Sequence, residues 1–477
     1  MLTLKLIYLL FDAIIIYSSL VVSGWLKFSS GMFQISPENL SADNLLLFLI
    51  LTLIFLVLCR FQYLYRISII DSGPNQTRRI VFTTLVGHIL MVIIFFLFKY
   101  RFITERLYVL ISFCLMTALL LIARLLVLPL LKSLLKKTSV LKKKTLLIGS
   151  GEKALDLFNH FKKIKGCYYR IAAVISLDGT DGTFVPELEK SNALLYRGVN
   201  HLEKAVHEND IREIIVAFDP EDTMTLLSLI EECRKLGIPV NAYSETFGIV
   251  AKKTVIDQFH RLPLARFGNH RNWDRNPLNR MINFSLSLVL LILLSPLLLL
   301  IAALIKLTSK GPVFYIDKRI GRNEKPINMI KFRSMKTNQP DSAHKNYTKQ
   351  FINGEIETGS FYKLQNDSRI TVVGRILRRY SLDELPQLFN VIRGDMNLVG
   401  PRPSKIYEYE QYDEWHKKRF QTTPGMTGLW QVKARSEVPF KDMIALDLYY
   451  AYTSHFWLDM DILARTLKAI LIGKGAV

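Results

Sequence analysis

At 477 residues the chain is too long for one ordinary core, and its length predicts about three domains. Half of its residues are apolar and its formal net charge is +21, which predicts a polyanionic partner. Many Lys and Arg residues lie beside long apolar runs, and no basic stripe carries stacking aromatics. We therefore interpret the partner as a membrane surface and exclude nucleic acid. No CxxC pair occurs, which argues against a zinc site or a disulfide framework among the four cysteines, Cys59, Cys114, Cys167 and Cys233.

The chain opens with four apolar runs, at 6–26, 43–59, 80–98 and 107–131. Each approaches the ~20 residues with which a helix crosses a bilayer, so we predict four transmembrane helices within 1–138. Asp12 interrupts the first run, which lacks a small-x-small cleavage site, so we favour a span over a signal peptide. For Asp12 we predict a hydrogen bond between helices, with a proton or ion path as the alternative.

Lys and Arg residues predict the orientation of this unit. The loop after the second run and the segment after the fourth are rich in them: Arg60, Arg66, Arg78 and Arg79, then Lys132, Lys136, Lys137, Lys142, Lys143 and Lys144. The positive-inside bias places both segments in the cytoplasm. The loop between the third and fourth runs would then lie outside, and its Lys99, Arg101 and Arg106 weaken the predicted orientation slightly.

A soluble α/β domain is predicted over 139–260. Residues 142–163, KKKTLLIGSGEKALDLFNHFKK, have the pattern of a strand, a glycine turn and a helix, and further strand-like runs occur at 171–177, 213–218 and 238–243. Their alternation with helical patterns is typical of a Rossmann-like, doubly wound parallel sheet.

Gly149, Gly151 and Ala154 match the dinucleotide pattern G-x-G-x-x-G/A, with Asp178 as a loose candidate for binding a ribose. Packing of a tight turn also requires glycine, and we favour that interpretation over an NAD(P) site. The chain has no Y-x-x-x-K pair, so it lacks the acid–base residues of a short-chain reductase.

A fifth apolar run, 281–305, contains no charged residue. Basic residues flank it on both sides: Arg261, Arg266, Arg271, Arg275 and Arg280 before it, and Lys306, Lys310, Lys318, Arg319, Arg322 and Lys325 after it. A crossing helix would place one of these clusters outside, against the positive-inside bias. Pro296 removes a helix hydrogen bond, and the Ser295 hydroxyl can satisfy the freed carbonyl. We predict a re-entrant helix broken at Ser295-Pro296, with a kinked span as the alternative.

The segment SLDELPQLFNVIRGDMNLVGPRP, 381–403, carries an acidic pair. Ser381 and Glu384 form a capping-box pattern, and Pro386 suits a first turn, so a helix should begin near 381–383. Its N-terminus would favour Asp383 as a carboxylate. Neighbours on a helix point about 100° apart, so one carboxylate could attack while the other holds a cation.

Many basic residues surround the pair in sequence: Lys331, Arg333, Arg369, Arg375, Arg378, Arg379 and Arg402. A helix cap with surface ion pairs would explain each feature separately. Carboxylates, arginines for phosphate oxygens and an adjacent membrane insertion are together the parts of a phosphoryl-transfer site, which we favour.

Four motifs follow one another in this region: KFRSM (331–335), the segment 381–403, PGMTGLWQV (424–432) and DLYYAYTSHFWLDMDIL (447–463). They closely resemble the bacterial polyprenyl-phosphate hexose-1-phosphate transferases, the undecaprenyl-phosphate glucose or galactose phosphotransferases that initiate exopolysaccharide, capsule or O-antigen synthesis. The four spans and the Rossmann-like domain look like the long form of that family. The resemblance implies a mainly helical, membrane-associated α/β catalytic domain over 261–477. It also implies a multi-pass protein of the bacterial inner membrane, with both soluble domains in the cytoplasm.

The resemblance also implies the chemistry. Asp383 would attack the β-phosphorus of a UDP-sugar, release UMP and hold the phosphosugar covalently before undecaprenyl phosphate accepts it. Glu384 would bind Mg²⁺, and Arg378 and Arg402 would bind phosphate oxygens. Further candidates for substrate binding are Lys331, Arg333 and Asp395. UDP-glucose is the first expectation for the sugar donor and UDP-galactose the second.

Two other functions remain open from the sequence. A membrane-anchored NAD(P)-dependent nucleotide-sugar oxidoreductase would use the α/β domain for catalysis. A non-enzymatic membrane scaffold would use the α/β domain to sense a ligand and would recruit polysaccharide machinery. The aromatic and basic segment 404–420 suits either an interfacial helix or an ordinary amphipathic helix on a soluble core. Homo-oligomerisation also stays open.

Overall fold

The computed structural model describes residues 2–29, 32–35, 41–65, 67–70, 72–97, 106–137, 143–149, 151–163, 169–177, 193–217, 223–244, 247–253, 264–268, 273–335, 348–353, 355, 370–433 and 438–472. They form two compact units, the first built mainly from Met1–Lys143 and the second from most of the remaining chain.

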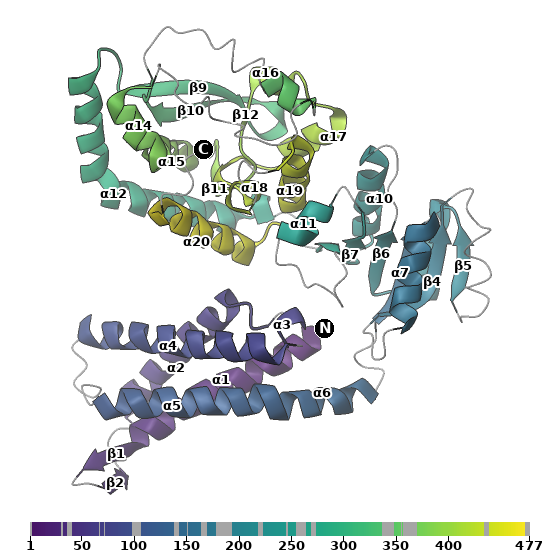
Figure 1. The fold of residues 1–477 in the computed structure, drawn as a ribbon, viewed down its shortest axis with the longest axis vertical. Helices are drawn as coiled ribbons and strands as arrows, with labels where there is room; N and C mark the ends of the chain where they lie inside the picture. The colour runs from purple at the N-terminus through teal and green to yellow at the C-terminus, as the bar shows by residue number, and fades with distance from the viewer. Residues whose placement is uncertain are drawn as a thin grey trace. The chain divides into compact units, whose positions relative to one another are not determined.

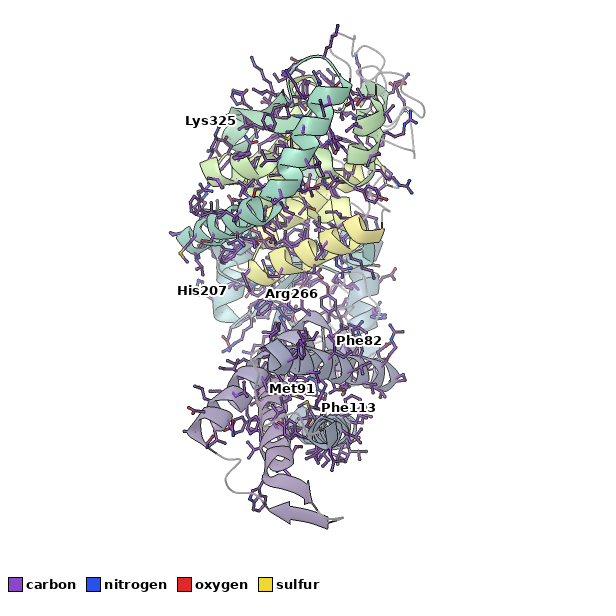
Figure 2. All side chains as sticks on the ribbon, turned by 90° about the vertical axis from the view of Figure 1, so that its left-hand side faces the viewer. Phe82, Met91, Phe113, His207, Arg266 and Lys325 are labelled. Carbon is purple, nitrogen blue, oxygen red and sulfur yellow. The ribbon has the colours of Figure 1, made fainter. Side chains whose placement is uncertain are left out.

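The first unit consists of long apolar helices. They are α1 (Leu2–Trp25), α2 (Ala42–Phe61), α4 (Gly73–Leu97) and α5 (Arg106–Ile122), which continues through a π-helical turn (Ala123–Val127) into α6 (Leu128–Lys137). A short helix α3 (Ile67–Ile70) and a hairpin of β1 (Leu26–Ser29) and β2 (Met32–Ile35) accompany them. Each predicted apolar run coincides with a helix that is long and apolar enough to cross a membrane. Figure 2 shows the side chains of this unit, with Met91 and Phe113 labelled among its helices.

A buried ion pair joins two of these helices. Asp12 in α1 pairs with Arg124 in the π-helical turn, and neither side chain is exposed. Arg124 Nε donates to Asp12 Oδ1 at 3.0 Å, and Nη1 donates to the Leu64 carbonyl at 2.9 Å. The rings of Tyr8 and Tyr65 lie 5.4 and 5.2 Å from the guanidinium. The predicted hydrogen bond from Asp12 to another helix is therefore confirmed.

In the second unit, the α/β part is a six-stranded sheet in the order β5-β4-β3-β6-β7-β8. Its strands are β3 (Lys143–Gly149), β4 (Tyr169–Ser176), β5 (Leu194–Arg197), β6 (Glu213–Ala217), β7 (Val240–Ala242) and β8 (Ala265–Phe267). Its helices are α7 (Gly151–Lys163), α9 (Leu202–Glu208), α10 (Thr223–Lys235) and α11 (Gly248–Lys253). Strands β3, β6 and β7 are parallel, as are β4 and β5, whereas β8 is an antiparallel edge strand. The predicted Rossmann-like sheet is present, and the sequence pattern missed β5 and β8.

Gly149 has the packing role predicted for it. A Cβ there would lie 2.4 Å from the carbonyl oxygen of Ala217 in β6 and 2.9 Å from the Cβ of Ala154 in α7. Only glycine allows this approach of strand to strand and helix. Asp178 lies outside the described residues.

Residues 273–472, over which the sequence motifs predict a catalytic domain, contain two small sheets among helices and are called the catalytic part (Figure 1). Strands β10 (Pro326–Phe332), β9 (Phe314–Ile320) and β12 (Ser404–Lys405) pair antiparallel in that order, and β11 (Asn397–Val399) pairs parallel with β13 (Gly425–Thr427). The helices are α12 (Pro277–Thr308), α14 (Val372–Arg379), α15 (Gln387–Arg393), α16 (Ile406–Tyr409), α17 (Glu414–Lys417), α18 (Leu429–Lys433), α19 (Phe440–Thr453) and α20 (Phe456–Ile472). Four 3₁₀ turns join them: η6 (Trp273–Arg275), η7 (Arg322–Glu324), η8 (Leu382–Glu384) and η9 (Lys418–Gln421).

Helix α12 is bent around its internal proline. It is one helix of 32 residues with Pro296 inside it, and Figure 1 shows it as two arms that meet at a sharp angle. Ser295 Oγ donates to the Ile292 carbonyl at 2.8 Å, which is the carbonyl that Pro296 cannot bond. The predicted hydrogen bond from the Ser295 hydroxyl to the carbonyl left free by Pro296 is therefore confirmed. The predicted break is wrong as secondary structure, because the helix bends at the proline without ending.

The first arm of α12 is fastened to the catalytic part by polar bonds. Arg280 donates to the carbonyls of Val391 and Ile392, both at 2.5 Å, at the end of α15. Asn283 Oδ1 accepts the Leu398 N–H of β11 at 2.7 Å.

The second arm is fastened to the same part by apolar packing. Ile301 and Ile305 form a buried cluster with Phe332 of β10 and Leu377 of α14. Both ends of α12 are therefore attached to one folded body.

Residues 404–420 form neither of the predicted helices. The segment is divided between β12, α16, α17 and η9, and three of its five aromatic residues, Tyr412, Trp415 and Phe420, lie in the buried core. Burial of these rings explains why the aromatic pattern resembled an interfacial helix.

Replacing Arg124 with leucine should strongly destabilise the first unit, because Asp12 would keep a buried charge without its cation. Loss of one partner of a buried pair costs about 3–5 kcal/mol. The double variant Asp12→Leu/Arg124→Leu removes both charges and should recover most of the loss. The measurement is the midpoint of thermal unfolding in detergent, and equal midpoints for Arg124→Leu and the wild type would contradict the expectation.

Candidate active site

The acidic pair lies in the 3₁₀ turn η8 and not in the first turn of an α-helix. Ser381 makes no side-chain cap bond, and α15 begins only at Gln387, after Pro386. The predicted capping box is therefore wrong, because Glu384 bonds elsewhere. Ser381 adopts a left-handed backbone with φ of 54°, which is uncommon for residues other than glycine. Such strain persists only where the surrounding structure holds it, and it often lies beside functional groups.

Asn390 attaches helix α15, which follows the turn, to strand β10. Asn390 in α15 is fully buried; its Oδ1 accepts the Ile330 N–H at 3.0 Å, and its Nδ2 donates to the Asn328 carbonyl at 2.7 Å. The same Nδ2 donates to Asp395 Oδ2 at 3.3 Å. The amide thus replaces a strand partner for β10 and holds the predicted site residue Asp395. Sequence reasoning missed Asn390, because an asparagine inside a helix carries no distinctive pattern.

Glu384 is held as an anion by the cations around it. Lys331 Nζ of β10 lies 2.8 Å from Glu384 Oε1. Burial by itself would raise the pKa of Glu384, but the charges of Lys331 and Arg402 outweigh burial and hold that pKa below its usual range. The charge of Arg319 acts in the same direction.

Asp383 has the opposite shift. Burial raises the pKa of Asp383 above its ordinary value, and the neighbouring charge of Glu384 adds to the effect. The charges of Lys331 and Arg378 oppose it only in part. We expected a helix N-terminus to favour the carboxylate form of Asp383. That expectation is wrong, because burial and a like charge dominate where no α-helix begins.

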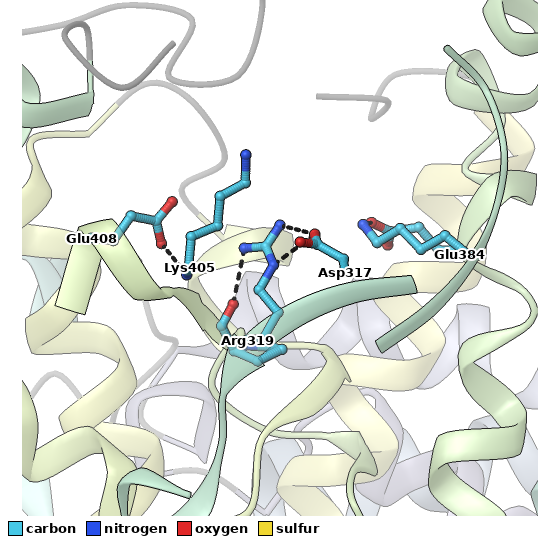
Figure 3. A network of polar contacts seen from close by, with 7 residues as sticks. Asp317, Arg319, Glu384, Lys405 and Glu408 are labelled. Carbon is cyan, nitrogen blue, oxygen red and sulfur yellow. Dashed lines mark hydrogen bonds and ion pairs between the residues drawn. The ribbon is translucent and has the colours of Figure 1, made fainter. Parts of the chain in front are cut away.

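Two further residues reach this site from strand β9. In the β9–β10 register Lys331 pairs with Tyr315, so Asp317 and Arg319, two and four residues along β9, share the face of Lys331. Arg319 is buried and donates through Nε to Asp317 Oδ2 at 2.8 Å; Figure 3 shows this pair beside Glu384. The sequence did contain a signal for them. Asp317 and Arg319 are two positions apart in a strand-like run, so they share one face, and the next strand-like run carries Lys331.

The remaining predicted residues divide between the site and its scaffold. Lys331 contacts Glu384 directly, while the charge of Arg378 lowers the pKa of Asp383 and that of Arg402 lowers the pKa of Glu384. Arg333 is not brought to the acidic pair. Its terminal nitrogens donate to the carbonyls of Ser309 and Lys310 at 2.9 and 2.8 Å, so it holds the chain after α12.

Comparison with known proteins assigns the family. Residues 274–473 match the bacterial sugar transferase family, and residues 60–243 match a CoA-binding domain family. The chain is 32% identical over 360 residues to the undecaprenyl-phosphate galactose phosphotransferase of Salmonella typhimurium, covering 72% of this chain and 71% of that protein. This chain belongs to the bacterial sugar transferase family.

Two other relatives agree with this assignment. The sugar transferase is 31% identical over 350 residues to the UDP-glucose:undecaprenyl-phosphate glucose-1-phosphate transferase of Klebsiella pneumoniae, covering 70% of this chain and 69% of that protein. It is 41% identical over 188 residues to the exopolysaccharide production protein ExoY of Rhizobium meliloti, covering 39% of this chain and 83% of that protein. The family resemblance of the sequence motifs is thus confirmed, and the chain is a sugar-phosphate transferase.

The donor set of the transferase fits a magnesium ion that is shared with a substrate. Within the part of the chain that the structure describes, no three His, Cys, Asp or Glu side chains gather as a metal cage. Mg²⁺ is usually held by one or two carboxylates together with substrate phosphates and water. Glu384, kept anionic beside Asp383, suits that mode.

Replacing Lys331 with methionine should move the acid limb of the pH–activity profile to higher pH. Lys331 lowers the pKa of both carboxylates, so without it both take up protons at a higher pH as the solution is acidified. Lys331→Arg keeps the positive charge and should keep the limb near that of the wild type. The measurement is kcat/KM against pH, which reports groups of the free enzyme. An unchanged limb in Lys331→Met would contradict the electrostatic role.

Proposed function

We propose that the transferase moves a hexose 1-phosphate from a UDP-sugar to undecaprenyl phosphate, releases UMP, and proceeds through a covalent intermediate on Asp383. This step would initiate synthesis of an exopolysaccharide, a capsule or an O-antigen. The names of the Salmonella and Klebsiella relatives support the two substrates.

The observation that carries the mechanism is the different surroundings of two adjacent carboxyl groups: Glu384 pairs with Lys331 at 2.8 Å, whereas Asp383 is buried. These surroundings shift the two pKa values in opposite directions. Two neighbouring titratable groups whose surroundings push their pKa values apart usually have different roles in the reaction. Glu384 stays ionised and is suited to hold a cation. The raised pKa of Asp383 makes its carboxylate more basic, and a more basic carboxylate is a better nucleophile wherever the pH exceeds that pKa.

The reaction takes place in two displacements at one site. An oxygen of the Asp383 carboxylate bonds to the β-phosphorus of the UDP-sugar, and the bond from that phosphorus to the bridging oxygen breaks as UMP leaves. A phosphate oxygen of undecaprenyl phosphate then bonds to the same phosphorus, and Asp383 leaves as a carboxylate. Lys331, Arg378 and Arg402 place three positive charges around the pair that can bind the diphosphate oxygens.

Glu384 would hold a Mg²⁺ ion on the diphosphate. The ion would offset negative charge as UMP leaves. The contribution of the chain is to keep the Glu384 carboxylate ionised, through Lys331 and Arg402.

The site should lie at the cytoplasmic surface of the membrane. We infer that α12 enters one leaflet and returns, because both of its arms are attached to the catalytic part. A straight helix of 32 residues would be about 48 Å long and would carry its ends to opposite sides. Exposed apolar side chains near the bend and on neighbouring elements suit contact with lipid: Leu288, Val289, Ile292, Leu293, Leu299 and Leu300 of α12, Phe314, Tyr315 and Ile316 of β9, and Val372 and Ile376 of α14.

The proposal also includes the membrane topology of the chain and the identity of the sugar donor. The four N-terminal helices cross the membrane with both ends inside, and the α/β and catalytic parts lie in the cytoplasm. UDP-glucose is the first donor to test and UDP-galactose the second, since relatives of both kinds match the chain.

Incubation with a UDP-sugar that carries radiolabel in its β-phosphate should label the purified protein when no lipid is present. Addition of undecaprenyl phosphate should move the label to the organic phase, because the acceptor displaces Asp383. Asp383→Asn lacks the nucleophile and should take up no label. Equal transfer to lipid by Asp383→Asn would remove Asp383 as the nucleophile, and no labelled lipid with any UDP-sugar would refute the activity.

Single cysteines at the two ends of α12 should be labelled from the same side of the membrane. Arg275→Cys and Lys310→Cys, both at exposed positions, would be made in a chain without its four natural cysteines. In intact spheroplasts a membrane-impermeant maleimide should reach neither site, and after permeabilisation it should reach both. A cysteine placed between α1 and α2, at Ser41, is the control for outside access. Labelling of Arg275→Cys or Lys310→Cys from outside would show that α12 spans the bilayer.

A further inference from the structure

Two buried arginines bond the main chain that carries Arg402. Arg419 Nη2 donates to the Arg402 carbonyl at 2.7 Å, and Arg319 Nη1 donates to the Pro403 carbonyl at 3.2 Å. Both guanidinium groups are almost completely buried, at 4% exposure. Consecutive carbonyls of one short segment are thus held by arginines from η9 and β9.

The segment needs this support because it has few donors of its own. Pro401 and Pro403 have no N–H, so only Arg402 could donate within residues 401–403. Regular hydrogen bonding between strands cannot hold a segment that lacks these N–H groups. Its position therefore depends on the hydrogen bonds that its carbonyl oxygens accept. The third carbonyl, of Pro401, accepts the N–H of Gly425 at 2.9 Å.

Each arginine is neutralised by an aspartate, of which Asp447 is buried and Asp317 is partly exposed. Arg319 pairs with Asp317 at 2.7 Å, and Arg419 pairs with Asp447 of α19 at 2.6 Å. In Arg419 one nitrogen, Nη2, contacts both the Asp447 carboxylate and the Arg402 carbonyl. The rigid, planar guanidinium fixes the direction of that nitrogen, whereas a lysine ammonium sits on a flexible stem.

Stability alone does not explain the Arg419–Asp447 pair. Desolvation of two charges cancels much of their attraction, and well-packed apolar residues are often as stable in their place. The pair does, however, fix one main-chain carbonyl in space. Arg319 also lowers the pKa of Glu384 through its charge, so its substitution would act on the site in two ways. Arg419 therefore offers the cleaner test.

We propose that Arg419, held by Asp447, is a positioning residue: it bonds the Arg402 carbonyl and thereby fixes the direction in which Arg402 presents its guanidinium to the donor diphosphate. The inference rests on the proposed function, since Arg402 is expected to bind phosphate oxygens only in that reaction. Arg419 itself does not touch the substrate. Its effect on the reaction passes through Arg402.

A double-mutant cycle between Arg419 and Arg402 tests this dependence. Arg419→Lys keeps the charge beside Asp447 but loses the rigid guanidinium that directs Nη2, so kcat/KM for UMP release should fall about tenfold or more in the wild-type background. In the Arg402→Ala background the same substitution should change kcat/KM less than about twofold, because the group it positions is absent. Asp447→Asn is the second variant; it keeps the side-chain shape and should show the same dependence on Arg402.

Arg280→Lys is the matched control. Arg280 also bonds two main-chain carbonyls, but at the end of α15, so its effect on activity should be the same with and without Arg402→Ala. The thermal unfolding midpoint of every variant is measured in parallel, and Asp447→Asn replaces Arg419→Lys in the cycle if the latter does not fold.

The outcomes separate the two claims. Coupling of Arg419 and Asp447 to Arg402, with none for Arg280, supports the positioning role. Equal losses in both backgrounds from an active enzyme overturn the inference and leave the proposed function standing. A wild-type protein that releases no UMP from any UDP-sugar in the presence of undecaprenyl phosphate overturns both.

Discussion

The attachment of both arms of one apolar helix to one folded body is the constraint on which the rest of the catalytic part depends. Arg280 and Asn283 fasten the first arm of α12, and Ile301 and Ile305 fasten the second. An exposed apolar surface of this size marks a contact with lipid or with another protein. Because both arms are held, α12 cannot leave the body, and whatever its exposed surface contacts must lie beside that body. The Ser295 hydroxyl makes the required bend tolerable by bonding the carbonyl that Pro296 leaves open.

The chemistry depends on a different balance, between burial and charge. Asp383 and Glu384 are adjacent and share the same turn, yet their pKa values move in opposite directions. The difference arises because Lys331 meets the Glu384 carboxylate directly, while Asp383 is buried and faces a like charge. Asn390 sets this geometry by attaching α15 to β10, the strand that carries Lys331. The two neighbouring carboxyl groups thus differ in their surroundings and in the direction of their pKa shifts, which is the difference that the proposed roles of nucleophile and metal ligand require.

The α/β part is bound to the catalytic part through α19. Glu231 of α10 accepts a hydrogen bond from the Tyr452 hydroxyl at 2.6 Å, and Arg234 donates to the Tyr452 carbonyl at 3.0 Å. The same helix carries Asp447, which neutralises Arg419. These contacts could not be predicted from the sequence, because each joins residues more than 200 positions apart and neither partner belongs to a periodic pattern.

The sequence by itself determined the features that depend on local composition. Apolar length predicted the long helices, alternation predicted four of the strands, and the spacing of motifs predicted the family and brought Lys331, Arg378 and Arg402 into consideration. Only the tertiary structure decided that Ser381 caps no helix, that Arg333 serves the chain after α12, and that Arg319 belongs with the site. The physical reason is that a cap, an ion pair or a pKa depends on which groups meet in space and how deeply they are buried. Local pattern sets the elements, and packing between distant segments sets the electrostatics of the site.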